Sequence, residues 1–558
     1  MTEPLLSVPM ESGSVNAAIK ITASKTRPAP AVRQNFCIEV TAKNTYLASL
    51  ATSFVPFPSS CKGQKVSEDN TRVSSRNQGA NIHNAFRYCQ ERFSVVWFPA
   101  LGDTRIYSRT IRNGTMQDNQ YTSKEVRALS VGKWSDPLVS VAIIVAVFLT
   151  FYATEITDVY LTLLIVLVVS AYLFFSELTR ARWKFKDRPQ QKIGDILDRT
   201  LTKFYGVLAG TLFIFFAVWL FPAYEHATNI GRLQEATLPF LAFIIPVSFF
   251  VILATEFLLG EKRDGTYQLG LLARWRVREI DWRIFFDGFL EWLLRCFFLL
   301  INFYAAVWYL SNLRTYGLPD ITGNFVDFIL RLDLAIFGMI IFAILPGYVF
   351  ASRLIGTELK KVDRTWFGWA INLSCYPPLN AAVFGSWVGY RPSPEMIEIY
   401  QGIPTWAYHT LQSPALLYVV AGIIIFLAFM HLWGEAILGI RAANMSSRGI
   451  ITTGPFSFTR HPIYVSKCFQ WGFLYFPVLN AIGFLDAIQS GLLFFLVCAI
   501  YAGRALGEEK LLATDENYVK YALYMDDKSM FAFVGRLFPV MTFRWRYEYW
   551  KKRGQLQY

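Results

Sequence analysis

The sequence is short of charge for its length. Only 17% of its 558 residues are Asp, Glu, Lys or Arg, whereas 54% are hydrophobic and 16% are aromatic. This balance excludes an ordinary soluble globular protein. The net charge of +13 could suggest nucleic acid as a partner. The basic residues lie in short connections between apolar runs, however, and no soluble basic domain with interleaved aromatic residues is evident. We therefore expect no nucleic-acid partner.

Cysteine and histidine are also scarce and scattered. The seven cysteines form no Cys-x-x-Cys pair, and the five histidines do not cluster along the chain. This spacing argues against a disulfide framework and against the usual metal-ligand patterns, so we expect no metal site. The sequence also lacks a glycine-rich phosphate-binding loop, which disfavours a nucleotide held by its phosphates.

Long apolar runs, by contrast, are abundant. From about residue 137 onward, runs long enough to cross roughly 30 Å of hydrocarbon recur along the chain. They lack the alternating pattern of barrel strands, and only helices or closed barrels satisfy the backbone in lipid. We therefore predict an all-α polytopic membrane protein with about ten transmembrane helices, embedded in the lipid bilayer. The predicted spans are residues 137–153, 157–175, 204–224, 238–259, 284–310, 325–350, 366–389, 413–433, 464–482 and 486–503.

The connections between these runs alternate in charge. Eight Lys and Arg residues lie between the second and third spans, and further basic groups follow the fourth, sixth and eighth spans. The connections on the other side contain only Arg232, Arg314 and Arg391. Because basic loops stay in the cytosol, this asymmetry predicts that both termini are cytosolic. The same basic loops are expected to face anionic lipid head groups.

Three regions differ in composition. Residues 1–130 are polar and rich in Ser, Thr and Asn. We favour a disordered cytosolic tail for this region over an organelle transit peptide, the alternative that its basic balance leaves open. Residues 131–412 form a multi-span membrane domain whose role the sequence does not indicate. Residues 413–558 form a membrane domain that carries a more informative motif.

Several ionisable residues fall inside predicted spans, where each needs a partner. Glu291 and Arg295 lie four residues apart and can pair along one helix face. Arg331 and Asp333 lie two apart on a helix, so each is expected to find its partner elsewhere. We expect structural pairing for these residues and for Glu256, which closes the fourth span.

The motif begins in the stretch 452-TTGPFSFTRHPIYVSK-467. Gly454 is expected to set a turn with the proline that follows it, and Pro462 suits the first position of a helix. Two spans of about twenty residues then separate His461 from the acidic pair Glu508 and Glu509. That length returns the pair to the membrane face from which the hairpin started.

A basic cluster beside an acidic pair suits a compact ligand that carries both signs of charge and an aromatic part. S-adenosylmethionine has these features. Arg460 would bind its carboxylate, and Glu508 or Glu509 would accept from its ammonium or its ribose hydroxyls. His461 and Tyr464 would contact its ring. The alternative for Arg460 and Tyr464 is simple anchoring at the membrane interface, where both residue types are common.

These residues resemble a known family. The pattern G-P-[aromatic]-x-x-x-R-H-P-x-Y, followed two spans later by E-E-x-x-L and a tyrosine-rich helix, is similar to the isoprenylcysteine carboxyl methyltransferase and phospholipid methyltransferase group. The matching residues are Gly454, Pro455, Phe456, Arg460, His461, Pro462, Tyr464, Glu508, Glu509, Leu512, Tyr518 and Tyr521. The resemblance covers about residues 420–540.

The resemblance implies a membrane enzyme that binds S-adenosylmethionine from the cytosol. Its acceptor would be lipophilic, either a prenylated protein or peptide carboxylate or a lipid, and would enter from the bilayer. The implied cofactor-binding residues are Gly454, Arg460, His461, Pro462, Tyr464, Glu508, Glu509 and Tyr518. Eight predicted spans precede the shared hairpin, more than the resemblance needs, so the acceptor is not carried over.

Two other functions stay open. Membrane sterol reductases carry a related Arg-His-x-x-Tyr hairpin and use NADPH, but they favour a Gly-Asp after the tyrosine and an Arg-Asp-Glu in the second motif. This chain has Val465-Ser466 and Gly507-Glu508-Glu509 at those places. The third possibility is a transporter or scaffold that keeps only the fold.

Overall fold

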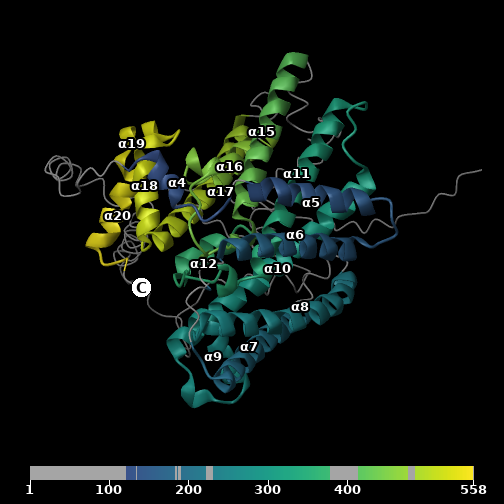
Figure 1. Cartoon of the computed structure of the whole chain (residues 1–558). Coiled ribbons are helices and arrows are strands. Elements are labelled where there is room, and N and C mark those ends of the chain that lie inside the picture. Colours follow the sequence, from purple (N-terminus) through teal and green to yellow (C-terminus); the bar gives the residue numbers. More distant parts are fainter. Residues whose placement is uncertain are drawn as a thin grey trace, which may run out of the picture. The chain divides into compact units, whose positions relative to one another are not determined.

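The structure, a computed structural model, describes residues 121–133, 135–181, 185, 190–220, 230–376, 413–475 and 484–556. All of them belong to the second of the two units into which the chain divides, residues 116–558. This part is almost entirely helical (Figure 1). Its longer helices are α4 (Ser123–Ala128), α5 (Ser135–Phe151), α6 (Asp158–Ala181), α7 (Ile193–Leu220), α8 (Ile230–Leu259), α9 (Gly265–Ala273), α10 (Trp282–Tyr316), α11 (Phe325–Val349), α12 (Trp366–Leu373), α15 (Pro414–Leu438), α16 (Pro462–Tyr475), α17 (Phe484–Leu512), α18 (Glu516–Lys528), α19 (Ala532–Leu537) and α20 (Phe543–Lys552). Two short strands, β1 (Lys361–Val362) and β2 (Ser446–Ser447), pair antiparallel.

In the part of the chain that the structure describes, four helical segments are long and apolar enough to cross a membrane. They are α6, Leu241–Leu259 within α8, α11, and Pro414–Arg441, which begins with α15. The shorter helix α5 is also apolar. The prediction of a helical membrane protein is confirmed at this level. Each of the ten predicted spans contains helix among its described residues, but the count of ten crossings and the cytosolic termini stay predictions.

The core joins the early helices to the C-terminal ones. Leu161 and Ile165 of α6, Leu310 of α10 and Leu345 of α11 are fully buried in one hydrophobic cluster. Helix α11 packs against both α10 and α15, and α15 packs against α16. The α15–α16 contact is close, because a Cβ added at Gly434 would lie 2.7 Å from the Ile463 side chain. The hairpin that follows is therefore held against the same bundle.

Ionisable residues inside the helices form the expected local pairs. Glu291 and Arg295 form an ion pair one turn apart on α10. Arg331 pairs with Asp327 at 2.6 Å, one turn earlier on α11. Such pairing neutralises charge that the hydrocarbon would otherwise exclude. The prediction of structural pairing is confirmed for these residues.

Asp333 connects two helices that are far apart in the sequence. Its carboxylate accepts a hydrogen bond from Nε2 of Gln470 at 2.7 Å. Asp333 lies on α11 and Gln470 on α16, so this bond ties the bundle to the first helix of the C-terminal hairpin. The partner that the sequence predicted to lie elsewhere is thus an amide from the motif-bearing region.

The last ten residues of the polar N-terminal region are ordered against the C-terminal part. Thr122 and Glu125 form a capping box at the start of α4. The carbonyl of Val126 accepts a hydrogen bond from Thr452 Oγ1 at 2.8 Å, and Val131 N–H donates to the carbonyl of Ile450 at 3.0 Å. Residues 1–120, including most of the predicted tail, lie outside the described residues.

Helices α4, α18 and α20 form a small apolar cluster of their own (Figure 1). Tyr521 and Met525 of α18 and Phe543 of α20 are almost fully buried there. The hydroxyl of Tyr521 donates to the carbonyl of Phe456 at 2.7 Å. This cluster supports the loop before α16 from one side.

Candidate functional site

The loop before α16 contains the predicted turn. Gly454 begins the short 3₁₀ helix η7 (Gly454–Ser457) with a φ of +62°, a conformation that glycine adopts at little cost. A Cβ at this position would lie 3.0 Å from Cδ1 of Ile437 and 3.3 Å from Nε1 of Trp433. The structure therefore gives Gly454 a backbone role in the turn.

The two ends of the hairpin meet as the sequence predicts. Pro462 occupies the first position of α16, directly after His461. Helix α17 has 29 residues, so it is about 43 Å long and exceeds the hydrocarbon thickness. Nε2 of His461 lies 3.0 Å from Oε1 of Glu509 in the last turn of α17. The predicted proximity of His461 and the acidic pair is confirmed.

Glu509 is the centre of a buried ion-pair network. Its side chain is 2% exposed. Besides His461, Nε of Arg460 lies 3.1 Å from Oε1, and Nε of Arg546 lies 3.1 Å from Oε2. Burial alone would raise the pKa of this carboxyl, but Arg546 and Arg460, with the His461 hydrogen bond, hold the pKa well below its usual range. Glu509 is thus an ionised carboxylate already surrounded by protein cations.

Arg460 is likewise paired with groups of the protein. Its Nη1 donates to the carbonyl of Ala522 at 3.1 Å and to the Asp526 carboxylate. Burial alone would lower the pKa of Arg460, but Glu509 and Asp526 outweigh it, so the pKa lies above the usual value. The two partners place this guanidinium between α17 and α18. They favour a scaffold role for Arg460 over the ligand-binding role that the sequence suggested.

Asp526 extends the network to the C-terminal helix. Its carboxylate accepts the backbone N–H groups of Phe543 at 2.9 Å and Arg544 at 2.8 Å, at the start of α20. A carboxylate at a helix N-terminus satisfies donors that have no partner within the helix. Arg460, Asp526 and Glu509 together therefore fix the loop, α17, α18 and α20 to one another.

Glu508 is far more accessible than its neighbour Glu509. Its side chain is 29% exposed, and its carboxylate accepts a hydrogen bond from the hydroxyl of Tyr464. Nδ1 of His461 lies 3.9 Å away. The rings of His461 and Tyr464 stack with centroids 5.8 Å apart and planes 11° apart. Glu508 therefore combines a partly accessible carboxylate with a nearby aromatic surface.

Arg504 lies one turn before Glu508 on α17. The guanidinium lies over the ring of Tyr464 at 5.1 Å and close to the rings of Tyr376 and Tyr501. Its Nη2 donates to Oδ1 of Asn444 at 2.9 Å, while its Nε is buried without a partner. Among the described residues no carboxylate lies within 4 Å of this cation. A buried arginine held by aromatic rings can still bind an anion.

Tyr518 lies in the apolar cluster of α18 and α20. It makes edge contacts with Phe543 at 5.7 Å and with Tyr521 at 6.0 Å. Burial, together with the nearby charge of Glu509, raises the pKa of Tyr518 well above its usual value. The ring contacts of Tyr518 are thus to α18 and α20 and not to the stacked rings of His461 and Tyr464.

Sequence analysis missed three of these residues. Arg546 lies beyond residues 420–540, Asp526 follows Tyr521, the last residue of the matching pattern, and Arg504 lies four residues before Glu508 without being part of that pattern. Arg504 could have been found as the lone cation at the end of an apolar run. Arg546 carried no such sign, since it is one of many basic residues in 543-FRWRYEYWKK-552.

The arrangement separates into a scaffold and an open face. Arg460, Glu509, Arg546 and Asp526 form the scaffold, which is internally neutralised. The second group, which we call the open face, combines the carboxylate of Glu508, 29% exposed, with the ring of Tyr464 and the guanidinium of Arg504, which is 4% exposed. Among the described residues no cluster of His, Cys, Asp and Glu is arranged to hold a metal ion. Comparison of the chain with protein families, curated proteins and solved structures finds no match.

Proposed function

We propose that this chain is an integral membrane methyltransferase that takes its methyl group from S-adenosylmethionine and transfers it to a lipophilic acceptor. The observation that carries the proposal is the different use of two adjacent carboxylates. Glu509 is paired with three basic side chains, whereas Glu508 is 29% exposed and accepts a hydrogen bond from Tyr464. A carboxylate that is fixed but not neutralised suits a cationic or polyhydroxylated ligand.

The residues of the open face fit the parts of such a donor. Glu508 would accept from the ammonium group or the ribose hydroxyls. Arg504 would bind the donor's carboxylate, the role that the sequence assigned to Arg460. The stacked rings of His461 and Tyr464 would lie beside the adenine, since aromatic surfaces favour a heterocycle.

The chemistry asks little of the protein beyond alignment. The methyl carbon leaves the sulfonium sulfur, which keeps the electron pair of the broken bond, while a lone pair of the acceptor forms the new bond. Tyr464, Glu508 and Arg504 would position the donor and help exclude water. A carboxylate acceptor needs no base, whereas an amine or hydroxyl would need one, and His461 or Glu508 would take that role.

The surroundings of the site favour an acceptor from the bilayer. An α17 that crosses the bilayer would, at about 43 Å, carry the site beyond the hydrocarbon, and the apolar helix α15 packs against η7 and α16, which lead into the site. The charge asymmetry of the connections favours the cytosolic face. The acceptor we propose is a prenylated protein or peptide carboxylate, or a lipid.

Binding of labelled S-adenosylmethionine to the purified full chain in detergent tests the proposal. We expect Glu508→Gln and Tyr464→Phe to weaken binding by about tenfold or more, because each removes one charge-assisted hydrogen bond. Glu516→Gln, which changes an exposed carboxylate at the start of α18, is the matched control and should bind normally. Tight binding of NADPH instead would support the reductase alternative, and a folded protein that binds neither compound would refute the enzyme.

A further inference from the structure

A cavity of 630 Å³ lies among the helices that precede the C-terminal hairpin. Its lining comes from α6, α7, α8, α10 and the end of α11, together with the segment 350–364. Cavities of about 300–1,000 Å³ are the usual size for small-molecule sites. The residues of the open face do not line this cavity, so the two would bind different ligands.

One part of the cavity is apolar. Val207 of α7, Ile252 of α8, and Leu299 and Phe303 of α10 contribute side chains to it. The α8 segment Leu241–Leu259 is one of the four candidate membrane spans, and only 11% of its most apolar window is buried. Few residues of this segment are therefore fully buried. The apolar part suits hydrocarbon and borders a helix surface that lipid would contact.

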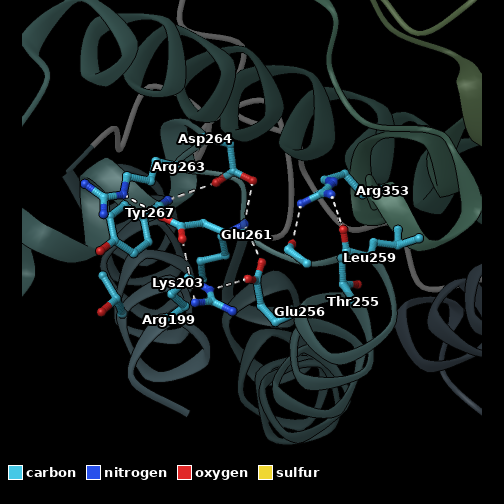
Figure 2. A network of polar contacts seen from close by, with 12 residues as sticks. Arg199, Lys203, Thr255, Glu256, Leu259, Glu261, Arg263, Asp264, Tyr267 and Arg353 are labelled. Atoms are coloured by element: carbon cyan, nitrogen blue, oxygen red, sulfur yellow. Dashed lines mark hydrogen bonds and ion pairs between the residues drawn. The ribbon is translucent and has the colours of Figure 1, made fainter. Parts of the chain in front are cut away.

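Another part of the lining is polar and belongs to a network of ion pairs and hydrogen bonds (Figure 2). Glu256 lies 2.9 Å from Nε of Arg199 and 2.8 Å from Nζ of Lys203. Lys203 also lies 2.8 Å from Asp264, which caps α9. These charges neutralise one another and fix the facing ends of α7, α8 and α9. The pairing expected for Glu256 is confirmed.

Within the described ranges, other cations of the lining have no carboxylate partner, and four of them, Lys262, Arg283, Lys360 and Lys361, are exposed and therefore lie at the rim of the cavity. The whole lining contains nine basic and five acidic side chains. Among the described residues, five of the basic ones have no carboxylate within 4 Å: Lys262, Arg283, Arg353, Lys360 and Lys361. Arg353 donates to the backbone carbonyls at the end of α8, and Lys361 donates to a threonine hydroxyl. Glu358 is the one acidic lining residue without an ion pair in the described part of the chain. The polar part therefore carries an excess of positive charge.

We propose that this cavity binds an anionic phospholipid, with its phosphate at the unneutralised cations and its hydrocarbon against the apolar wall. A small anion would leave the apolar part unfilled, and a neutral hydrocarbon would leave the cations unneutralised. Basic pockets between membrane helices bind anionic head groups for the same electrostatic reason. One molecule with a charged head and an apolar tail satisfies both parts of the lining.

The cavity reaches the helix that carries the carboxylate pair. Leu511 of α17 lines it, three residues after Glu508, and Lys361 hydrogen-bonds to Thr514 just beyond the end of that helix. Lipid in the cavity would thus be in contact with α17. The inference does not rest on methyl transfer, because lipid binding is measured without a methyl donor.

Lipid binding to the full chain purified in detergent tests the proposal, with phosphatidylglycerol compared with phosphatidylcholine of the same acyl chains. We expect the wild type to prefer phosphatidylglycerol by about tenfold or more. The variant Lys262→Ala/Arg283→Ala/Lys360→Ala should lose most of that preference. The control Lys192→Ala/Arg278→Ala/Lys551→Ala removes three exposed cations outside the cavity and should keep it.

A second variant addresses the apolar part. Ile252→Trp should fill it and weaken binding of phosphatidylglycerol by about tenfold, with a thermal unfolding transition that shows the chain is folded. Equal binding of the two lipids by the wild type, or equal losses in the cavity and control variants, would overturn the proposal. It would also be overturned if inorganic phosphate protected the chain from unfolding as well as phosphatidylglycerol does, because the tail would then contribute nothing.

Discussion

Glu508 and Glu509 are consecutive residues of α17 that occupy opposite environments. Glu509 is 2% exposed and contacts Arg460, His461 and Arg546, whereas Glu508 is 29% exposed and is held by the hydroxyl of Tyr464. Successive helical residues point about 100° apart, so one can face the protein while the next faces the site. Replacing both carboxylates at once would combine loss of the ion-pair network with loss of the proposed ligand contact, whereas single substitutions separate these two effects.

Glu509→Gln should destabilise the fold, while Glu508→Gln should not. The first leaves Arg546 without its anion and Arg460 with Asp526 as its one remaining carboxylate partner in the network, and breaking a buried network of this kind costs about 3–5 kcal/mol. The second weakens one hydrogen bond of a partly exposed group and should cost about 1 kcal/mol or less. Thermal unfolding in detergent distinguishes them. Equal melting temperatures for the two variants would contradict the assignment of Glu509 to the scaffold.

The same carboxylate predicts a loss of stability in acid. The folded-state pKa of Glu509 lies below its ordinary value of 4.5, so its contribution is complete above that value and is lost as the pH falls toward the folded pKa. The melting temperature of the wild type should therefore fall more than that of Glu509→Gln between about pH 6 and about pH 3.5. Other carboxylates titrate in both proteins, so the difference between the two curves is the quantity to measure. Parallel curves would show that Glu509 does not titrate as proposed.

Arg546 and Glu509 should be energetically coupled. Arg546→Gln and Glu509→Gln each leave part of the network unpaired, and the double variant removes both charges. A double-mutant cycle of unfolding free energies should give a coupling of about 1–3 kcal/mol, as expected for residues in direct contact. The control is Arg544, whose ion pair with Asp527 is exposed at 3.7 Å. An Arg544→Gln/Asp527→Asn cycle should give about 1 kcal/mol or less. Similar values for the two cycles would argue against a special role for Arg546.

Much of the fold was accessible from apolar run length alone. Runs of about twenty apolar residues can satisfy their backbone in lipid only as helices, and helix is present in the described part of each predicted span. The return of Glu509 to His461 followed from the same lengths. The sequence could not show how many helices cross the membrane, because charged residues such as Glu291 and Arg314 fall within α10 and make its length and apolarity a poor guide.

The roles of the site residues were less accessible. The motif brought Arg460, His461, Glu508 and Glu509 together, but the rotation of α17 decides which carboxylate is buried, and packing sets that rotation. Arg546 reaches the network only because Asp526 holds the start of α20 beside it. Contacts between segments that are separated by irregular connections leave no spacing pattern to recognise. The sequence therefore predicted that these residues come together, whereas the protein partners of Arg460 favour a scaffold role over the predicted ligand-binding role.

Gly454→Ala tests whether the turn before α16 is required for the site. Gly454 has a φ of +62°, which costs an alanine roughly 1–2 kcal/mol, and its new Cβ would lie 3.0 Å from Ile437. Gly507→Ala is the matched control, because Gly507 lies within α17 and a Cβ there meets nothing within 4 Å. That change should leave stability unaltered or raise it by up to about 1 kcal/mol through helix propensity. The melting temperature should therefore fall for Gly454→Ala and hold or rise for Gly507→Ala. If Gly454→Ala were as stable as the wild type, the loop would not need this backbone conformation, and the position of His461 would have to depend on the ion-pair network alone.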